Sequence, residues 1–245
     1  MSREEGVNPI LIIFQRMCIV KSKALTWAVI IGVIVTFVVP TTVMMCQEKE
    51  KIVRLKNAYS VFSQAYTRAT IDNSTVDSWD IGSSSDEESS VKLYDYFKPY
   101  LIKTKSCGKK GDCFSDNYKA LFADNFKYQP SKYSMKTKGI LSNGISFLFL
   151  SSGSGCETNY TNGHFNQYCG SIFVDVNGSD KPNRAGVDLF GFGITPEGIF
   201  PFGVDNSSNY KNTCKYKDFS NTNGITCTNW AINNENMDYL KKSIY

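Results

Sequence analysis

The sequence has little that could support catalysis. It contains one histidine, His164, in the polar stretch TNYTNGHFNQY, and a catalytic triad would need that side chain beside a nucleophile and an acid. The nucleophile motif G-x-S-x-G is absent, as are the phosphate-binding motifs G-x-G-x-x-G and G-x-x-x-x-G-K-S/T. We therefore expect His164 to be a solvated loop residue and the protein not to be an enzyme.

The chain also lacks a strong charge of either sign. Its formal net charge is +4. Residues 1–23 hold four basic and two acidic side chains and so contribute +2, which leaves +2 for everything that follows. A domain this close to neutrality has no strong electrostatic attraction for nucleic acid. We therefore expect no nucleic-acid partner, unless the protein serves in DNA uptake.

Charge is missing altogether from residues 24–46, ALTWAVIIGVIVTFVVPTTVMMC. A helix of about 20 apolar residues crosses a bilayer core, and a spanning segment must satisfy its backbone hydrogen bonds internally. We therefore expect a transmembrane helix, with a buried helix of a soluble protein as the alternative. Arg16, Lys21 and Lys23 precede the span and favour a cytoplasmic N-terminus. Residues 1–23 would then be a cytoplasmic segment or leader.

A stripe of apolar residues at helical spacing follows the span directly. Its members are Ile52, Leu55, Tyr59, Phe62, Tyr66 and Ala69. Steps of three and four residues place them on one face of an amphipathic helix. No glycine or proline separates the stripe from the span, so we expect one helix from near Ile19 to near Asp72, with residues 47–72 as its amphipathic half and Pro40 as a kink. The aromatic members favour packing on a sheet over a coiled-coil stalk.

Residues 73–245 are expected to form an α+β domain outside the cytoplasm. The segment SVKLYDYFKPYLI has apolar residues at four-residue steps and predicts a short helix. From Lys138 onward four segments predict strands: GILSNGISFLFL, whose apolar run follows the turn former Asn143-Gly144, then GSIFVDV, DLFGFGI and GIFPFGV. Short strands joined by tight turns indicate an antiparallel sheet. The last segment, CTNWAINNENMDYLKKS, predicts a short helix or an irregular cap.

Six of the eight cysteines lie in this domain. They are Cys107, Cys113, Cys156, Cys169, Cys214 and Cys227. An even number in a loop-rich domain is typical of disulfides in an oxidising compartment, whereas the spacings, without any C-x-x-C, do not suit zinc. Six cysteines allow 15 connectivities, among which we favour the three local pairs of successive cysteines. Cys18 and Cys46 flank the span and are expected to be free.

The hydrophobic helix, its proline, the polar boundary and RLKNAYSVFSQAY together resemble the type IV pilin-like proteins of bacteria, which include type II secretion pseudopilins. Three more segments resemble one branch of that group: YFKPYLIKTKSCGKKGDCF, IFVDVNGSDKPNRAGVDLFGFGITPEGIFPFG and CTNWAINNENMDYL. The second is the most specific, because D-V-N-G, P-N, G and D-x-F stand in the order and spacing of that branch. The resemblance runs from about Ile19 to the end. It implies a pilin-like fold, in which a long N-terminal helix packs on a small antiparallel sheet with long disulfide-pinned loops.

The resemblance also implies processing, but one residue departs from the family pattern. A membrane peptidase cleaves the family after a small residue, and the mature chain has glutamate at its fifth position. Matching Pro40 without gaps starts the mature chain at Ile19, after Cys18, and places Lys23 where the family has glutamate. A shifted match at Leu25 requires a deletion and supplies no glutamate. We therefore expect either a minor, tip or initiating subunit, or an unprocessed membrane protein with a pilin-like outer domain.

Oxygen-bearing side chains surround the turn between the second and third predicted strands. They are Asp175, Asn177, Ser179, Asp180 and Asp188. Calcium takes six to eight such oxygens, and the resemblance implies a calcium site as one use, with Asp175, Asn177 and Asp188 as ligands. An EF-hand has glycine at its sixth loop position, whereas Gly178 is the fourth. We favour an Asx-type turn bonded to nearby backbone amides, and expect at most weak calcium binding and no other cofactor.

The expected function is structural. The protein would be a single-pass inner-membrane protein that assembles into a type II secretion or type IV pilus-type filament, with other pilin-like subunits, the inner-membrane assembly platform and prepilin peptidase as partners. The residues expected to pack helix against helix, or otherwise to contact lipid, are Ile30, Ile31, Val33, Val35, Phe37 and Val38. The alternative is a signal-anchored binding protein, an adhesin or a DNA-uptake receptor, that does not polymerise.

Overall fold

The structure is a computed structural model. It describes residues 27, 39–82, 86–109, 112–153, 156, 167–204 and 213–244. By its internal contacts the chain divides into two units, Met1–Gln47 and Glu48–Tyr245. Within the described part, no helix combines the length and the apolar character needed to cross a bilayer.

Several predictions concern residues outside the described part of the chain. The predicted leader lies there, with the processing positions Cys18 and Ile19, and so does His164. Most of the predicted span lies there too, including all six of its proposed packing residues: Ile30, Ile31, Val33, Val35, Phe37 and Val38. Pro40 belongs to the first helix below. The span, the kink and the processing site therefore stay predictions.

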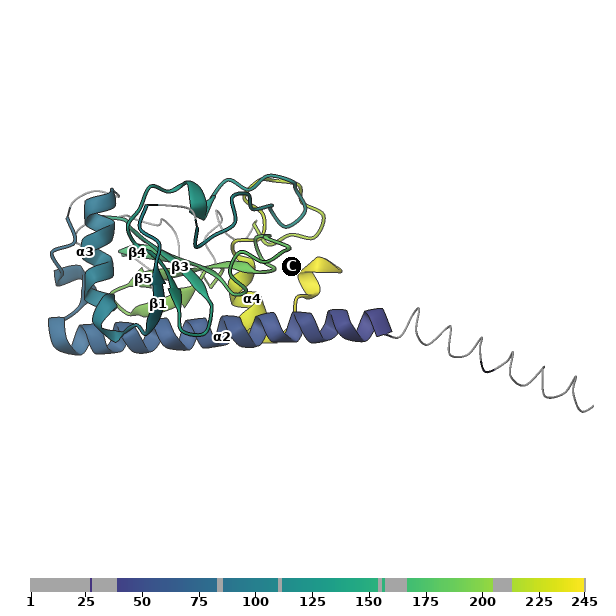
Figure 1. Cartoon of the computed structure of the whole chain (residues 1–245), viewed down its shortest axis with the longest axis horizontal. Helices are drawn as coiled ribbons and strands as arrows, with labels where there is room; N and C mark the ends of the chain where they lie inside the picture. Colours follow the sequence, from purple (N-terminus) through teal and green to yellow (C-terminus); the bar gives the residue numbers. More distant parts are fainter. Residues whose placement is uncertain are drawn as a thin grey trace, which may run out of the picture. The chain divides into compact units, whose positions relative to one another are not determined.

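The longest described element is helix α2, Val39–Asn73. From Glu48 onward it lies along the sheet of the larger unit (Figure 1). The residues that it buries are Ile52, Leu55, Ala58, Phe62, Ala65, Tyr66 and Ala69. The predicted amphipathic stripe is thus confirmed, with Tyr59 half-buried at its edge. The helix ends one residue beyond the predicted Asp72, where Ser74 adopts a φ of 68°, a left-handed conformation common after helix ends.

Six strands form one antiparallel sheet in the order in which they occur in the sequence. They are β1 (Lys103–Ser106), β2 (Lys138–Leu141), β3 (Ser146–Ser151), β4 (Gly170–Asp175), β5 (Leu189–Thr195) and β6 (Gly198–Pro201). The first predicted strand segment is a hairpin, β2 and β3, closed at the predicted turn, where Gly144 has a φ of 83°. The sequence pattern misses β1, because KTKS has no apolar residue to show alternation; its pairing with β2 makes it a strand.

Both faces of the sheet are covered. Successive residues of a strand point to opposite faces, so Phe147 and Phe149 of β3 join the cluster around α2 while Leu148 joins a second cluster. The second cluster is supplied by irregular segments on the far side, among them Phe114, Tyr118, Phe126 and Ile225. The sheet is therefore the middle layer of the domain, and the predicted α+β class with a long helix on an antiparallel sheet is confirmed.

Two shorter helices pack against strands of the sheet. They are α3 (Glu87–Phe97) and α4 (Cys227–Asn234), with 3-10 turns at Val76–Ser78, Lys98–Tyr100, Pro130–Lys132 and Asp238–Leu240. Helix α3 begins where Asp86 accepts a hydrogen bond of 2.8 Å from the backbone N–H of Ser89, a helix cap that satisfies one of the otherwise unpaired N–H groups. It ends before Pro99, which a helix interior does not tolerate. Both predicted short helices are present.

Candidate functional site

The connector between β4 and β5 brings together two of the predicted oxygen ligands. Asp175 ends β4 and pairs with Leu189, the first residue of β5, and Asp188 precedes Leu189 in the chain. Antiparallel pairing therefore places both carboxylates at the same end of the sheet. Both side chains are fully buried, with no solvent exposure, whereas Ser179 and Asp180 at the tip of the connector are exposed.

All four carboxylate oxygens of this pair already accept hydrogen bonds from the chain. Asp175 Oδ1 accepts from the backbone N–H of Asn177 over 3.1 Å, and Oδ2 accepts from the Tyr118 hydroxyl. Asp188 accepts from the backbone N–H groups of Asn183, at 2.7 Å, and Arg184, at 2.5 Å. The bond from Asn177 is that of an Asx turn, the favoured interpretation of this loop. The two aspartates therefore fold the connector and anchor it to the segment that carries Tyr118.

Calcium binding by this connector stays a prediction. The oxygens Asn177 Oδ1 and Asn183 Oδ1 are buried and have no hydrogen-bond partner among the described residues, so amide oxygens are present beside the aspartates. In the part of the chain that the structure describes, however, no three His, Cys, Asp or Glu side chains come together as a metal-binding group. The organised hydrogen bonds support a structural role first.

The buried pair is electrostatically unusual. Burial raises the pKa of Asp175 well above its ordinary value, and the neighbouring Asp188 adds to that rise by repulsion. Burial also raises the pKa of Asp188, although the N–H groups of Arg184 and Asn183 and the charge of Lys51 oppose the rise. Burial together with Asp175 raises the pKa of the Tyr118 hydroxyl. This hydroxyl therefore stays protonated and remains a donor.

These pKa shifts predict an inverted pH dependence of stability. A carboxyl group whose folded pKa is raised stabilises the fold below its unfolded pKa near 3.8, and that stabilisation is lost as the pH rises through the folded pKa. The pair's contribution to the free energy of unfolding should therefore fall from pH 4 toward neutral pH. Urea unfolding at a series of pH values measures it. The variant Asp175→Asn should flatten the profile, whereas Asp180→Asn, at an exposed position, should keep the wild-type slope; equal slopes in all three proteins would refute the assignment.

The six cysteines pair as the sequence analysis favours. The disulfides join Cys107 to Cys113, Cys156 to Cys169 and Cys214 to Cys227. Cys46 is free and exposed. The disulfides close local loops of the domain and therefore stabilise segments that the sheet alone does not hold.

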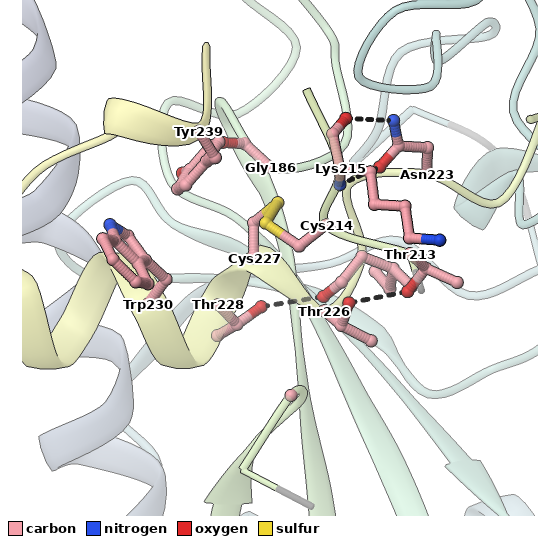
Figure 2. Close-up of a disulfide and its surroundings, with 12 residues drawn as sticks. Gly186, Thr213, Cys214, Lys215, Asn223, Thr226, Cys227, Thr228, Trp230 and Tyr239 are labelled. Carbon is pink, nitrogen blue, oxygen red and sulfur yellow. Dashed lines mark hydrogen bonds between the residues drawn. A yellow bond between two sulfur atoms is a disulfide. The ribbon is translucent and has the colours of Figure 1, made fainter. Parts of the chain in front are cut away.

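The third disulfide joins the first residue of α4 to a loop (Figure 2). The Oγ1 atoms of Thr213 and Thr226, one residue before each cysteine, share a hydrogen bond of 2.6 Å. Asn223 accepts from the backbone N–H of Lys215 at 3.0 Å and donates to its carbonyl at 2.8 Å. Gly224 lies so close to Ala185 that a side chain would place its Cβ 2.4 Å from the Ala185 carbonyl oxygen. The disulfide and these hydrogen bonds therefore hold a loop that packs closely against the β4–β5 connector at Ala185.

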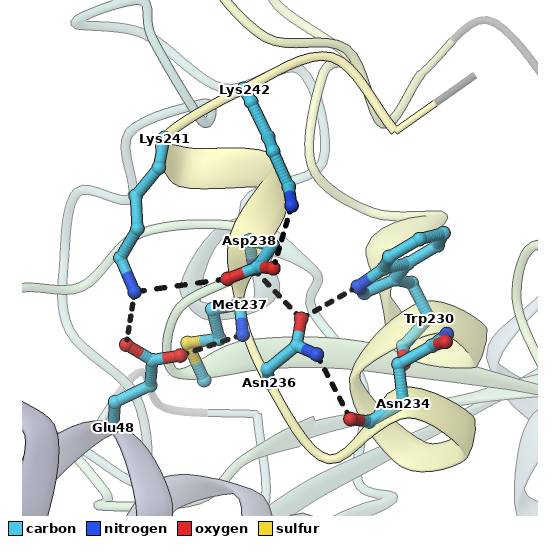
Figure 3. A network of polar contacts seen from close by, with 8 residues as sticks. All are labelled: Glu48, Trp230, Asn234, Asn236, Met237, Asp238, Lys241 and Lys242. Carbon is cyan, nitrogen blue, oxygen red and sulfur yellow. Dashed lines mark hydrogen bonds and ion pairs between the residues drawn. The ribbon is translucent and has the colours of Figure 1, made fainter.

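The C-terminal segment is fastened to α2 by Glu48 (Figure 3). One carboxylate oxygen of Glu48 accepts from the backbone N–H of Met237 at 2.7 Å, and the other lies 3.2 Å from Lys241 Nζ. The Trp230 indole N–H donates to Asn236 Oδ1 at 2.9 Å and so ties α4 to the same segment. The C-terminal segment is therefore packed into the larger unit and held there by these polar contacts.

An open cavity of about 330 Å³ lies where α2 ends beside α3. Its lining residues are Asp72, Asn73, Asp95, Tyr96, Pro99 and Tyr100. The Tyr100 hydroxyl donates a hydrogen bond to Asp72 Oδ2. The sequence analysis did not predict this cavity. Its only local sign is the group of tyrosines around Asp95 in YDYFKPY, which by itself does not indicate a pocket. Asp72 reaches these residues only because α2 and α3 pack together.

No protein-family model, curated protein or solved structure matches the chain. Any assignment of function therefore depends on the residues and geometry described above.

Proposed function

We propose that this protein is a non-enzymatic, pilin-like subunit of a type II secretion or type IV pilus-type filament. One observation carries the proposal: α2 buries one face on the sheet and exposes an opposite face that has no charged side chain along its centre. The resemblance of residues 19–245 to pilin-like proteins supports the same assignment, as does the disulfide-pinned domain behind the helix.

The exposed face runs over five turns of α2. Its members, spaced three and four residues apart, are Val53, Asn57, Ser60, Gln64, Thr67 and Ile71. Val53 is 66% exposed and Ile71 is 76% exposed. A solvated helix face usually carries charged residues, whereas here the charged side chains of Lys56 and Arg68 lie on the two flanks of the face and not along its centre. We name these six residues the outer stripe.

The polar members of the outer stripe already have hydrogen-bond partners within the same chain. Gln64 Nε2 donates to Ser60 Oγ at 2.9 Å, Thr67 Oγ1 donates to a carbonyl oxygen one turn back, at 3.0 Å, and Asn57 Oδ1 accepts from Asn143 at 2.6 Å. A second subunit can therefore cover the centre of the stripe without burying a charge or breaking these hydrogen bonds, which are the costly events in forming an interface.

The proposed mechanism is mechanical. Residues 24–46 hold the subunit in the inner membrane with its domain outside, and assembly moves the apolar helices from lipid into the core of a filament. The side chains proposed to pack there are Ile30, Ile31, Val33, Val35, Phe37 and Val38. Lys23 in place of the family glutamate suits a minor, tip or initiating position, because a lysine repels the N-terminal amine of a neighbouring subunit whereas a carboxylate attracts it.

Shearing of surface fibres tests this function. We expect the protein in sheared fibres, with a mature N-terminus at Ile19 or Leu25. The variant Val53→Asp places a charge on the outer stripe and should lower the fibre fraction by about tenfold or more. A loss of about 1.4 kcal/mol in the free energy of each subunit–subunit contact is enough for a tenfold effect. The matched control Ile102→Asp changes a side chain that is 78% exposed outside α2 and should leave the fibre fraction unchanged. An intact Met1 together with protein found entirely in membranes would refute assembly.

A second candidate is a signal-anchored binding protein that does not polymerise. The cavity between α2 and α3 favours it, because a purely structural subunit has no need of a pocket lined by carboxylates and tyrosines. The same fractionation distinguishes the two candidates, since an anchored protein stays with membranes and keeps Met1.

A further inference from the structure

The walls of the cavity at the end of α2 are held in place by contacts within the chain. The Tyr96 ring stacks on Trp79, with 4.4 Å between ring centroids and 15° between planes, and Trp79 is itself buried. The Tyr96 hydroxyl accepts a hydrogen bond from the backbone N–H of Asp80 at 3.3 Å. Tyr100 is oriented by its bond to Asp72. Such preorganised side chains lose little conformational entropy when a ligand binds.

The charge of the cavity is negative. Its lining includes Asp72 and Asp95 but no lysine, arginine or histidine. Asp95 has an ion pair with Lys98 at 3.6 Å, in which both side chains are 54% exposed, and an exposed pair of this kind is weak. Among the described residues Asp72 has no basic partner, and its hydrogen bond comes from a neutral hydroxyl. A cation can therefore approach both carboxylates without displacing a strong internal partner.

From these features we infer that the cavity binds a small organic cation with an alkylammonium group, of the quaternary ammonium class. The faces of aromatic rings attract cations, and quaternary ammonium groups are bound in this way by aromatic cages. The carboxylates of Asp72 and Asp95, both on exposed residues, add Coulomb attraction for a cation. The cavity volume lies at the small end of the range for ligand pockets, which suits a choline-sized group. The inference does not depend on whether the protein polymerises.

Anions and neutral ligands fit the site less well. Phosphate or sulfate would face two carboxylates with no basic side chain in the lining. A neutral isostere of choline would keep the van der Waals contacts with Tyr96, Pro99 and Tyr100, but it would gain nothing from the carboxylates or from the ring faces. Charge is therefore the property that should decide binding here.

Saturation-transfer NMR on the full chain, kept in a neutral oxyethylene detergent, tests the site. Choline should give a saturable signal from its N-methyl protons, and its neutral isostere 3,3-dimethylbutanol should bind at least about tenfold more weakly, a difference of about 1.4 kcal/mol. Glycerophosphocholine, the soluble headgroup of phosphatidylcholine, distinguishes the source of the group: binding at least as tight as that of choline indicates a lipid headgroup, and weaker binding indicates a free small molecule.

Two variants and one matched control locate the site. Asp72→Asn removes a charge from the lining, Tyr100→Leu removes a ring, and each should weaken choline binding by about tenfold. Asp180→Asn removes an exposed charge at the tip of the β4–β5 connector, outside the cavity lining, and should leave binding unchanged. Circular dichroism verifies that each variant is folded. Choline binding that is absent, equal to that of the neutral isostere, or unaffected by Asp72→Asn in a folded protein would overturn the inference.

Discussion

Replacing Phe62 with alanine is expected to lower the free energy of unfolding by about 3–5 kcal/mol. Phe62 is fully buried in the middle of the α2 stripe. Its ring centroid lies 6.0 Å from that of Phe147 and 5.7 Å from that of Phe149, both in β3, and 6.5 Å from that of Phe192 in β5. Truncation therefore removes the contacts that join the helix to the centre of the sheet, and it leaves a cavity that neighbouring strands cannot close.

Guanidinium unfolding followed by circular dichroism measures this loss. The matched control is Val53→Ala, which shortens an apolar side chain of the same helix on its outer stripe. Since Val53 is 66% exposed, the control should change stability by no more than about 0.5 kcal/mol. If the two variants lose equal stability, α2 does not pack on the sheet through the predicted face.

Removing the disulfide between Cys214 and Cys227 is expected to cost about 3 kcal/mol. The bond spans a sequence separation of 13 residues, and closing a loop of that size limits the conformations of the unfolded chain. In the folded protein it holds the first residue of α4, and both cysteines are buried. The double variant Cys214→Ala with Cys227→Ala should therefore unfold at a clearly lower denaturant concentration.

The same chain offers graded controls for the disulfide. Cys46→Ala changes the free, exposed cysteine and should have almost no effect. The double alanine variant of Cys107 and Cys113 opens a loop with a separation of 6 residues, so its cost should be smaller than that of the longer loop. Unfolding is measured without reductant, with free thiols counted by mass spectrometry. A Cys214/Cys227 double variant as stable as the unmodified protein would contradict the proposed bracing of α4.

Much of the fold is predictable from local sequence pattern. The stripe that includes Leu55 and Phe62 repeats with the helical period, and the strands from Lys138 onward are short apolar runs bounded by turn formers, so their positions follow from local spacing. Two strands are exceptions: the pattern counted β2 and β3 as one strand segment, and it missed β1, whose residues show no alternation and which pairs with the edge of β2. The requirement for glycine at position 191 is also invisible in the local sequence, because it comes from the Phe202 ring, which would lie 2.3 Å from a Cβ at this position.

The candidate sites were less predictable. The oxygens of the β4–β5 connector are visible in the sequence. The burial of Asp175 and Asp188, and the hydrogen bond that Asp175 accepts from Tyr118, 57 residues earlier, depend on which segment covers the far face of the sheet. The cavity beside α3 shows this more strongly. Asp72 and Tyr100 are 28 residues apart, and each is unremarkable in its own segment.

The sequence by itself determined the uncharged stretch at residues 24–46, the amphipathic helix after it and the apolar strands, and it favoured the local pairing of cysteines, because each is encoded within one segment or between near neighbours in the chain. Tertiary structure alone decided which carboxylates are buried, which face of α2 stays exposed as the outer stripe, how Glu48 anchors the C-terminal segment, and where Asp72 meets Tyr100. Those features arise when distant segments pack against each other, and burial and pairing of that kind have no local periodicity to reveal them.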